Sequence, residues 1–218
     1  MASKAPRQGR DFIARHGETV FNAARRLQGD HPHTPLTRAG FAQANEMGEA
    51  LHRLLGPKPS LALWASPTGR ALQTLAVIAE HVGLDWHGAA TDPRLVEIGM
   101  GEWGGLYYAE VKGDGPILDP RTGLFAQRAP GGEWYDEIAA RVSGWLAETN
   151  DDPGDRLIVM HGISSRVMRG VMTGAEAEPR FAAPIAPGLP QGSLVMIEGG
   201  VETLVYLGGG EGGGDAPA

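Results

Sequence analysis

Cysteine is absent from the 218 residues of this chain. Its absence excludes a disulfide scaffold, a thiol nucleophile and a zinc–thiolate site, and it suits a reducing compartment, so we expect a cytoplasmic protein. A chain of this length buries roughly 70% of the surface that its unfolded form exposes, and it therefore needs neither cross-links nor a metal ion in order to fold.

Other absences narrow the class of partner. No uninterrupted apolar run reaches ~18 residues, so no segment is predicted to span a membrane. Residues 1–10 are polar and basic with no apolar core after them, which is unlike a secretory signal. The net charge is −7 and the basic residues are scattered, so nucleic acid is not expected as a partner. The sequence defines no oligomeric state.

Short apolar runs alternate with helical patterns along the chain. We expect strands at 12–14, 61–65, 156–160, 193–197 and 202–207, and helices at 38–55, from the Ser66-Pro67 pair to about 81, at 134–148 and at 162–174. This alternation predicts a three-layer α/β/α sandwich with a mostly parallel sheet. We place a single domain at 11–207, between flexible ends at 1–10 and at 208–218, where glycine is abundant.

Charged residues follow three of the predicted strands. In an open α/β sheet, ligands bind beyond the carboxyl ends of the strands, beside helix N-termini. Arg15, His16, Arg70 and His161 are therefore expected to converge on one crevice. Two arginines and two histidines near helix N-termini describe a phosphate site, because the guanidinium fork meets two phosphate oxygens at once. Taken singly, each residue also fits a structural histidine or a solvated arginine, and their joint occurrence favours the site.

Six sequence blocks support this interpretation. They lie at 12–19 (Phe-Ile-Ala-Arg-His-Gly-Glu-Thr), 35–40, 65–74, 97–105, 130–133 and 159–166. In content and order they resemble the histidine phosphatase (phosphoglycerate mutase-like) superfamily. The resemblance covers residues 12 to about 207 and implies a phosphoglycerate mutase-like fold.

The resemblance also implies roles for individual residues. His16 would be a nucleophile that forms a phosphohistidine, and Glu97 would protonate the leaving alcohol and then take a proton from water. The implied phosphate ligands are Arg15, Asn22, Arg70, His161 and Gly162. No metal and no other cofactor is expected, because arginine and histidine supply the positive charge. Glu18 and Glu102 also lie near motif residues and stay open as alternatives for the acid.

The expected function is hydrolysis of a small organic phosphate monoester. Only 63 residues lie between Glu97 and His161, and basic residues are thinly spread among them, which resembles the phosphatase branch rather than the cofactor-dependent mutases. A mutase-type phosphoryl transfer and a phosphoester-binding module without turnover remain as alternatives. Residues 105–131 have no clear period and are predicted to form an excursion that lines the substrate pocket.

Overall fold

The computed structural model describes residues 7–112 and 115–210. At its centre lies a six-stranded sheet with the order β3-β2-β4-β1-β7-β8. Its strands are β1 (Asp11–Arg15), β2 (Leu61–Ala65), β3 (Ala90–Thr91), β4 (Asp155–Met160), β7 (Leu194–Glu198) and β8 (Val201–Tyr206). Strands β3, β2, β4 and β1 run parallel, whereas β7 is antiparallel to both β1 and β8. A separate hairpin pairs β5 (Ala177–Glu178) with β6 (Ala183–Pro184).

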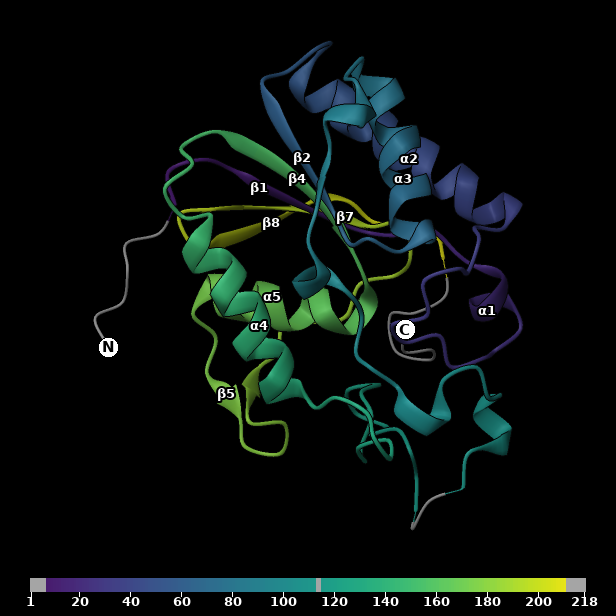
Figure 1. The fold of residues 1–218 in the computed structure, drawn as a ribbon. Helices are drawn as coiled ribbons and strands as arrows, with labels where there is room; N and C mark the ends of the chain where they lie inside the picture. The colour runs from purple at the N-terminus through teal and green to yellow at the C-terminus, as the bar shows by residue number, and fades with distance from the viewer. Residues whose placement is uncertain (1–6, 113–114, 211–218) are drawn as a thin grey trace.

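Helices cover both faces of the sheet, which confirms the three-layer prediction (Figure 1). On one face lie α2 (Arg38–Leu55) and α3 (Gly69–Val82), and on the other lie α4 (Tyr135–Glu148) and α5 (Gly162–Thr173). The short helix α1 (Val20–Ala23) follows β1. Single 3₁₀ turns lie at Trp86–Gly88, Pro93–Leu95, Gly101–Trp103 and Tyr108–Glu110.

Strand β1 shows why these residues form the central layer. All five of its residues are buried. Successive side chains of a strand point to opposite faces, so Phe12 and Ala14 pack with α2 and α3, whereas Ile13 packs with α4 and α5. A strand that is covered on both faces by helices must be apolar on both faces, as the middle of this one is at Phe12, Ile13 and Ala14.

The start of α3 differs from the sequence prediction. The Ser66-Pro67 pair predicts an N-cap followed by the first helical residue, but the helix begins at Gly69 with Thr68 at the N-cap. The Ser66 hydroxyl accepts a hydrogen bond from the Thr68 N–H (3.4 Å) and thus forms a local turn before the helix. The delay of two residues places Arg70 in the first turn of α3.

The two predicted flexible ends are only partly described. Arg10 donates from its backbone N–H (2.8 Å) and from its guanidinium (2.6 Å) to Asp155, and Arg7 pairs with Asp11. At the other end, the Gly208 N–H donates to the Ser193 hydroxyl (3.0 Å). The flexibility of both ends stays a prediction, and 1–6 and 211–218 lie outside the described residues.

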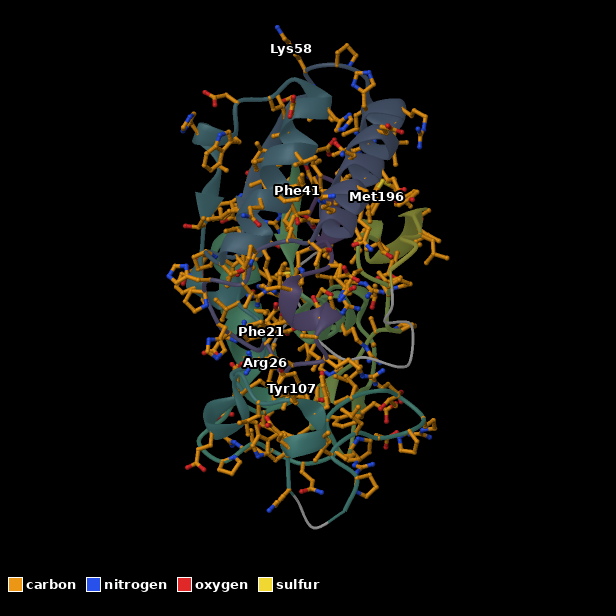
Figure 2. The ribbon with its side chains drawn as sticks, turned by 90° about the vertical axis from the view of Figure 1, so that its right-hand side faces the viewer. Phe21, Arg26, Phe41, Lys58, Tyr107 and Met196 are labelled. Atoms are coloured by element: carbon orange, nitrogen blue, oxygen red, sulfur yellow. The ribbon has the colours of Figure 1, made fainter. Side chains whose placement is uncertain are left out.

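The excursion at 105–131 begins against the segment that follows α1. The Leu27 N–H donates to Leu106 O (2.9 Å), and the Gly105 N–H donates to Leu27 O (2.8 Å). The guanidinium of Arg26 lies over the rings of Tyr107 (4.6 Å) and Phe21 (5.4 Å), and Figure 2 shows these three side chains next to one another. In Figure 1 the excursion occupies the same end of the molecule as α1. Positions 113–114 of the excursion are not among the described residues.

Candidate active site

Strand register brings the two histidines together. Strands β1 and β4 are parallel neighbours, and Arg15 lies opposite Met160 at their carboxyl ends. The residues that follow, His16 and His161, therefore leave the sheet side by side. Their ring centroids are 5.1 Å apart with an interplanar angle of 67°. Both side chains are buried.

The hydrogen bond of His16 identifies its tautomer. Its Nδ1 lies 2.7 Å from the carbonyl oxygen of Gly17. A carbonyl oxygen only accepts, so Nδ1 carries the hydrogen and Nε2 carries the lone pair. This Nε2 is buried and has no hydrogen-bond partner among the described residues. The nitrogen that is chemically able to attack is therefore the one that the protein leaves available.

His161 has the opposite tautomer. Arg70 donates from Nε to Nδ1 of His161 at 3.2 Å. A guanidinium only donates, so Nδ1 of His161 accepts and Nε2 carries the hydrogen. Nε2 of His161 is likewise buried without a partner in the described part of the chain. One histidine thus offers a lone pair and the other offers an N–H donor.

Both histidines are neutral at neutral pH. Burial is the main reason that the pKa of His16 and of His161 lies well below the ordinary value of 6.5, and the positive charge of Arg70 lowers both further. The contribution of burial is the larger of the two. A neutral imidazole is required both for attack by His16 and for the tautomer of His161.

Arg70 does more than the phosphate ligation that the sequence predicted. It is fully buried and donates to Gly29 O (2.7 Å), His31 O (2.6 Å) and the Thr34 hydroxyl (3.0 Å), in addition to His161. Burial lowers its pKa to about 10, so it stays protonated at neutral pH. Arg70 therefore ties the loop at 29–34 to His161, and its contact with phosphate stays a prediction.

Glu97 caps the helix that follows His161. It is fully buried, and its Oε1 accepts hydrogen bonds from the backbone N–H groups of Ile98 (2.9 Å) and Ser164 (2.8 Å). Its Oε2 accepts one from Ile163 (2.9 Å) and is the oxygen with fewer donors. The negative charge of Glu97 also opposes the lowering of the pKa of Arg15 by burial. Glu97 therefore belongs to the same charged cluster as the predicted phosphate ligands.

This contact changes the expected role of the helix N-termini. The sequence predicts that they attract phosphate, but the anion at the N-terminus of α5 is the carboxylate of Glu97. At the N-terminus of α3, the Gly69 N–H donates to Pro32 O (2.8 Å). A carboxylate and a carbonyl from the same chain thus satisfy these donors. Gly162, the first residue of α5, stays a predicted ligand.

The two alternative acids lie in different surroundings. The hydroxyl of Thr37 donates to Oε1 of Glu18 at 2.5 Å, which places that carboxylate at the start of α2. Glu102 lies on a 3₁₀ turn and is exposed. Neither is buried, as Glu97 is, and the choice of Glu97 as the acid stays a prediction.

A pair of amide side chains lies near α1. The Thr19 hydroxyl lies 2.8 Å from the amide of Asn22 and 2.6 Å from the amide of Gln28. Oδ1 of Asn22 also accepts a hydrogen bond from the Thr19 N–H (3.1 Å), so the NH₂ group of Asn22 turns away from Thr19. The hydroxyl has one hydrogen, which serves only one amide oxygen, so Gln28 meets it with its NH₂ group. Gln28 is fully buried, and no local signal in the sequence points to it.

Arg15 lies at the carboxyl end of β1 and is 5% exposed. Its backbone N–H donates to Ser193 O (3.0 Å), and its Nη1 donates to Leu189 O (2.6 Å). These contacts hold the guanidinium beside His16, whose pKa its charge lowers. The structure therefore brings together Arg15, His16, Arg70, Glu97 and His161, as the sequence predicts.

Two further observations concern metals and membranes. Among the described residues, no three histidine, aspartate or glutamate side chains gather closely enough to hold a metal ion. In the same part of the chain, no helix is both long enough and apolar enough to cross a bilayer.

The fold and the paired histidines define a class of phosphoryl-transfer proteins. The sequence model of the histidine phosphatase superfamily (branch 1) matches residues 12–203. The chain belongs to this superfamily.

Relatives and solved structures carry both phosphatase and mutase names. The chain is 35% identical over 170 residues to "Probable phosphoglycerate mutase GpmB" of Enterobacter sp. (strain 638), covering 76% of this chain and 75% of the relative. A mycobacterial glucosyl-3-phosphoglycerate phosphatase superposes with a TM-score of 0.71 at 24% identity, over 93% of this chain and all of that one. The α-ribazole phosphatase of Shigella flexneri gives 0.68 at 23% identity, over 91% and 96%. These two structures show the fold alone.

Proposed function

We propose that this protein hydrolyses a small organic phosphate monoester through a phosphohistidine on His16. One observation carries the proposal, namely the opposite tautomers of the two buried histidines. Nε2 of His16 has the lone pair that attacks phosphorus, and Nε2–H of His161 can donate to a phosphoryl oxygen. A binding module would need a donor such as His161 but no nucleophile.

The reaction balances in two displacements. In the first, a bond forms between Nε2 of His16 and phosphorus, the bond from phosphorus to the ester oxygen breaks, and the alcohol leaves with a proton from Glu97. In the second, Glu97 takes a proton from water, whose oxygen attacks phosphorus and releases inorganic phosphate and neutral His16. Oε2 of Glu97, with fewer protein donors than Oε1, is the oxygen suited to carry the proton.

Protein donors stabilise the negative charge on the oxygens of the phosphoryl group during its transfer. Arg15 and Arg70 bring positive charge, and the NH₂ group of Asn22, which turns away from Thr19, brings a further donor. Such groups stabilise the transition state because the folded protein has already fixed their orientation. They also supply the charge that a metal ion would give, so the proposed reaction is metal-independent.

A mutase is the second candidate, because the curated relatives at 35% identity carry phosphoglycerate mutase names. Both reactions use the same phosphohistidine and differ in the acceptor of the phosphoryl group. The excursion at 105–131, which starts beside Arg26 and Leu27, is proposed to select the alcohol part of the substrate.

The experiment follows 3-phosphoglycerate and p-nitrophenyl phosphate by phosphorus NMR with the wild type and with His16→Ala. The proposal predicts inorganic phosphate from the wild type and a rate lowered at least about 10³-fold in His16→Ala. Formation of 2-phosphoglycerate without phosphate would favour the mutase. Binding of both esters without turnover would contradict both enzymes and favour the binding module.

A further inference from the structure

An ion pair between Arg141 of α4 and Glu133, which lies just before that helix, holds the backbone around the proposed acid. Arg141 and Glu133 form a bidentate pair, with Nε to Oε1 at 2.6 Å and Nη2 to Oε2 at 3.0 Å, and their side chains are only 16% and 20% exposed. Arg141 also donates from Nη1 to Arg94 O and from Nη2 to Glu97 O (3.4 Å). One guanidinium therefore reaches two carbonyls of the segment 94–97.

Glu133 forms hydrogen bonds with the backbone on the other side of Glu97, at Gly99. Its backbone N–H donates to Gly99 O (2.8 Å), and its Oε2 accepts from the Gly99 N–H (3.3 Å). The segment is thus held at residues 94, 97 and 99, with Glu97 in the middle.

A cleft lies beside this segment. It has a volume of about 420 Å³, and Val96, Glu97 and Gly99 line it together with Glu133 and Arg141. On the side of the cleft, the described side chains of the hydrophobic core do not pack against the segment 96–99. On that side, the hydrogen bonds to Arg141 and Glu133 hold the segment. At its other end, the Glu97 side chain is fixed by the N-terminus of α5.

We infer that Arg141 and Glu133 position Glu97 for proton transfer to the leaving alcohol, an inference that rests on the proposed function. Held at its backbone by the pair and at its carboxylate by α5, Glu97 has few ways to move. Proton transfer requires heavy atoms about 2.6–3.2 Å apart, so small shifts of the segment are costly. The charge of Arg141 also contributes to the low pKa of His161, after burial, Arg70 and His16. Neither side chain is placed in contact with the phosphate, so both are positioning residues.

The test compares a good and a poor leaving group. A poor leaving group such as an alkyl alcohol needs a proton, whereas p-nitrophenolate does not. Arg141→Gln is expected to lower kcat/KM for an alkyl phosphate about tenfold more than for p-nitrophenyl phosphate. Glu133→Gln keeps the shape of the side chain and one oxygen that can accept hydrogen bonds. It should therefore also lower kcat/KM more for the alkyl phosphate than for p-nitrophenyl phosphate, but by a smaller factor. It serves as the second variant if Arg141→Gln folds poorly.

Arg10→Gln is the matched control. It breaks another two-pronged arginine–carboxylate pair, with Asp155, at the opposite end of β4 from His161. It should leave the ratio of the two kcat/KM values unchanged. A fall by the same factor for both esters in Arg141→Gln and in Glu133→Gln would overturn the inference and make the pair scaffold only.

A double variant separates this inference from the proposed function. In a Glu97→Gln background, Arg141→Gln should cause no further change in the ratio, because there is no acid left to position. A further change there would overturn the inference while leaving the acid role of Glu97 intact. If Glu97→Gln alone slows both esters equally, the failure lies in the proposed function, and the inference falls with it.

Discussion

Arg70→Lys tests the network that fixes the tautomer of His161. Lysine keeps the positive charge but loses the fork through which Arg70 reaches His161, Gly29, His31 and Thr34. The lysine side chain is shorter, and its ammonium group can keep a hydrogen bond to one of these four acceptors. The other three lose a charged donor; Arg70, Thr34 and His161 are buried, whereas His31 is exposed.

The expected loss of stability follows from these bonds. A hydrogen bond from a charged donor contributes about 1.5–3 kcal/mol, and relaxation of the loop at 29–34 recovers part of that for the exposed acceptors. Breaking a buried charged network typically costs about 3–5 kcal/mol, and we expect Arg70→Lys to fall in this range. For a chain of this size that corresponds to a drop in Tm of roughly 6–20 °C. Because His161 loses its fixed tautomer, kcat/KM should fall about 10²-fold or more.

The assay pairs urea denaturation with phosphatase kinetics. Arg180→Lys is the control, since Arg180 is 52% exposed and pairs with Asp119 near the surface. That change should stay within about 0.5 kcal/mol of the wild type and leave kcat/KM intact. A wild-type free energy of unfolding in Arg70→Lys would refute the network. Lower stability with unchanged kcat/KM would refute the link from Arg70 to His161.

Four further predictions follow from the site. The pKa of His16 and of His161 is well below 6.5 in the folded protein, so below about pH 6.5 the unfolded chain binds more protons than the folded one. The free energy of unfolding should therefore decrease as the pH is lowered from about 6.5, by up to about 1.4 kcal/mol per pH unit for each histidine. His161→Gln should halve that part of the slope in denaturation series, and an unchanged slope would mean that His161 is charged in the folded protein. Gln28→Ala should lower kcat/KM about tenfold, while Gln127→Ala in the excursion should not, and equal values would remove Gln28 from the site. Activity should persist in EDTA, and its loss on chelation with recovery on adding magnesium would contradict the proposed charge balance. Shortening the segment between 113 and 124 should alter the ratio of rates among several phosphoesters, whereas a uniform change would make the excursion scaffold.

Much of the fold follows from local patterns. Helix α2 begins after Thr37 and ends before Gly56, as its N-cap hydroxyl and its positive-φ glycine predict. Strand β2 matches its apolar run at both ends. The short elements α1, β3, β5 and β6 were not predicted, because two to four residues carry no period. Their formation depends on partners that are distant in sequence.

The site was predictable as far as strand ends determine it. The rule that ligands gather beyond the carboxyl ends of parallel strands places Arg15, His16 and His161 together, and register confirms the proximity. The capping of α5 by Glu97 was not predictable, because the contact spans 67 positions and leaves no local pattern. The burial of Gln28 was likewise not predictable, nor was the size of the contribution that burial makes to the low pKa of the two histidines.

The most direct test of the account traps the phosphorylated enzyme. The wild type is mixed with a phosphoester, quenched in base within milliseconds and examined by mass spectrometry for the modified residue and by phosphorus NMR for the linkage. The account predicts phosphate on His16, attached through Nε2, because Nδ1 donates to Gly17 O. Phosphate on His161, attachment through Nδ1 of His16, or turnover with no phosphorylated enzyme would contradict it.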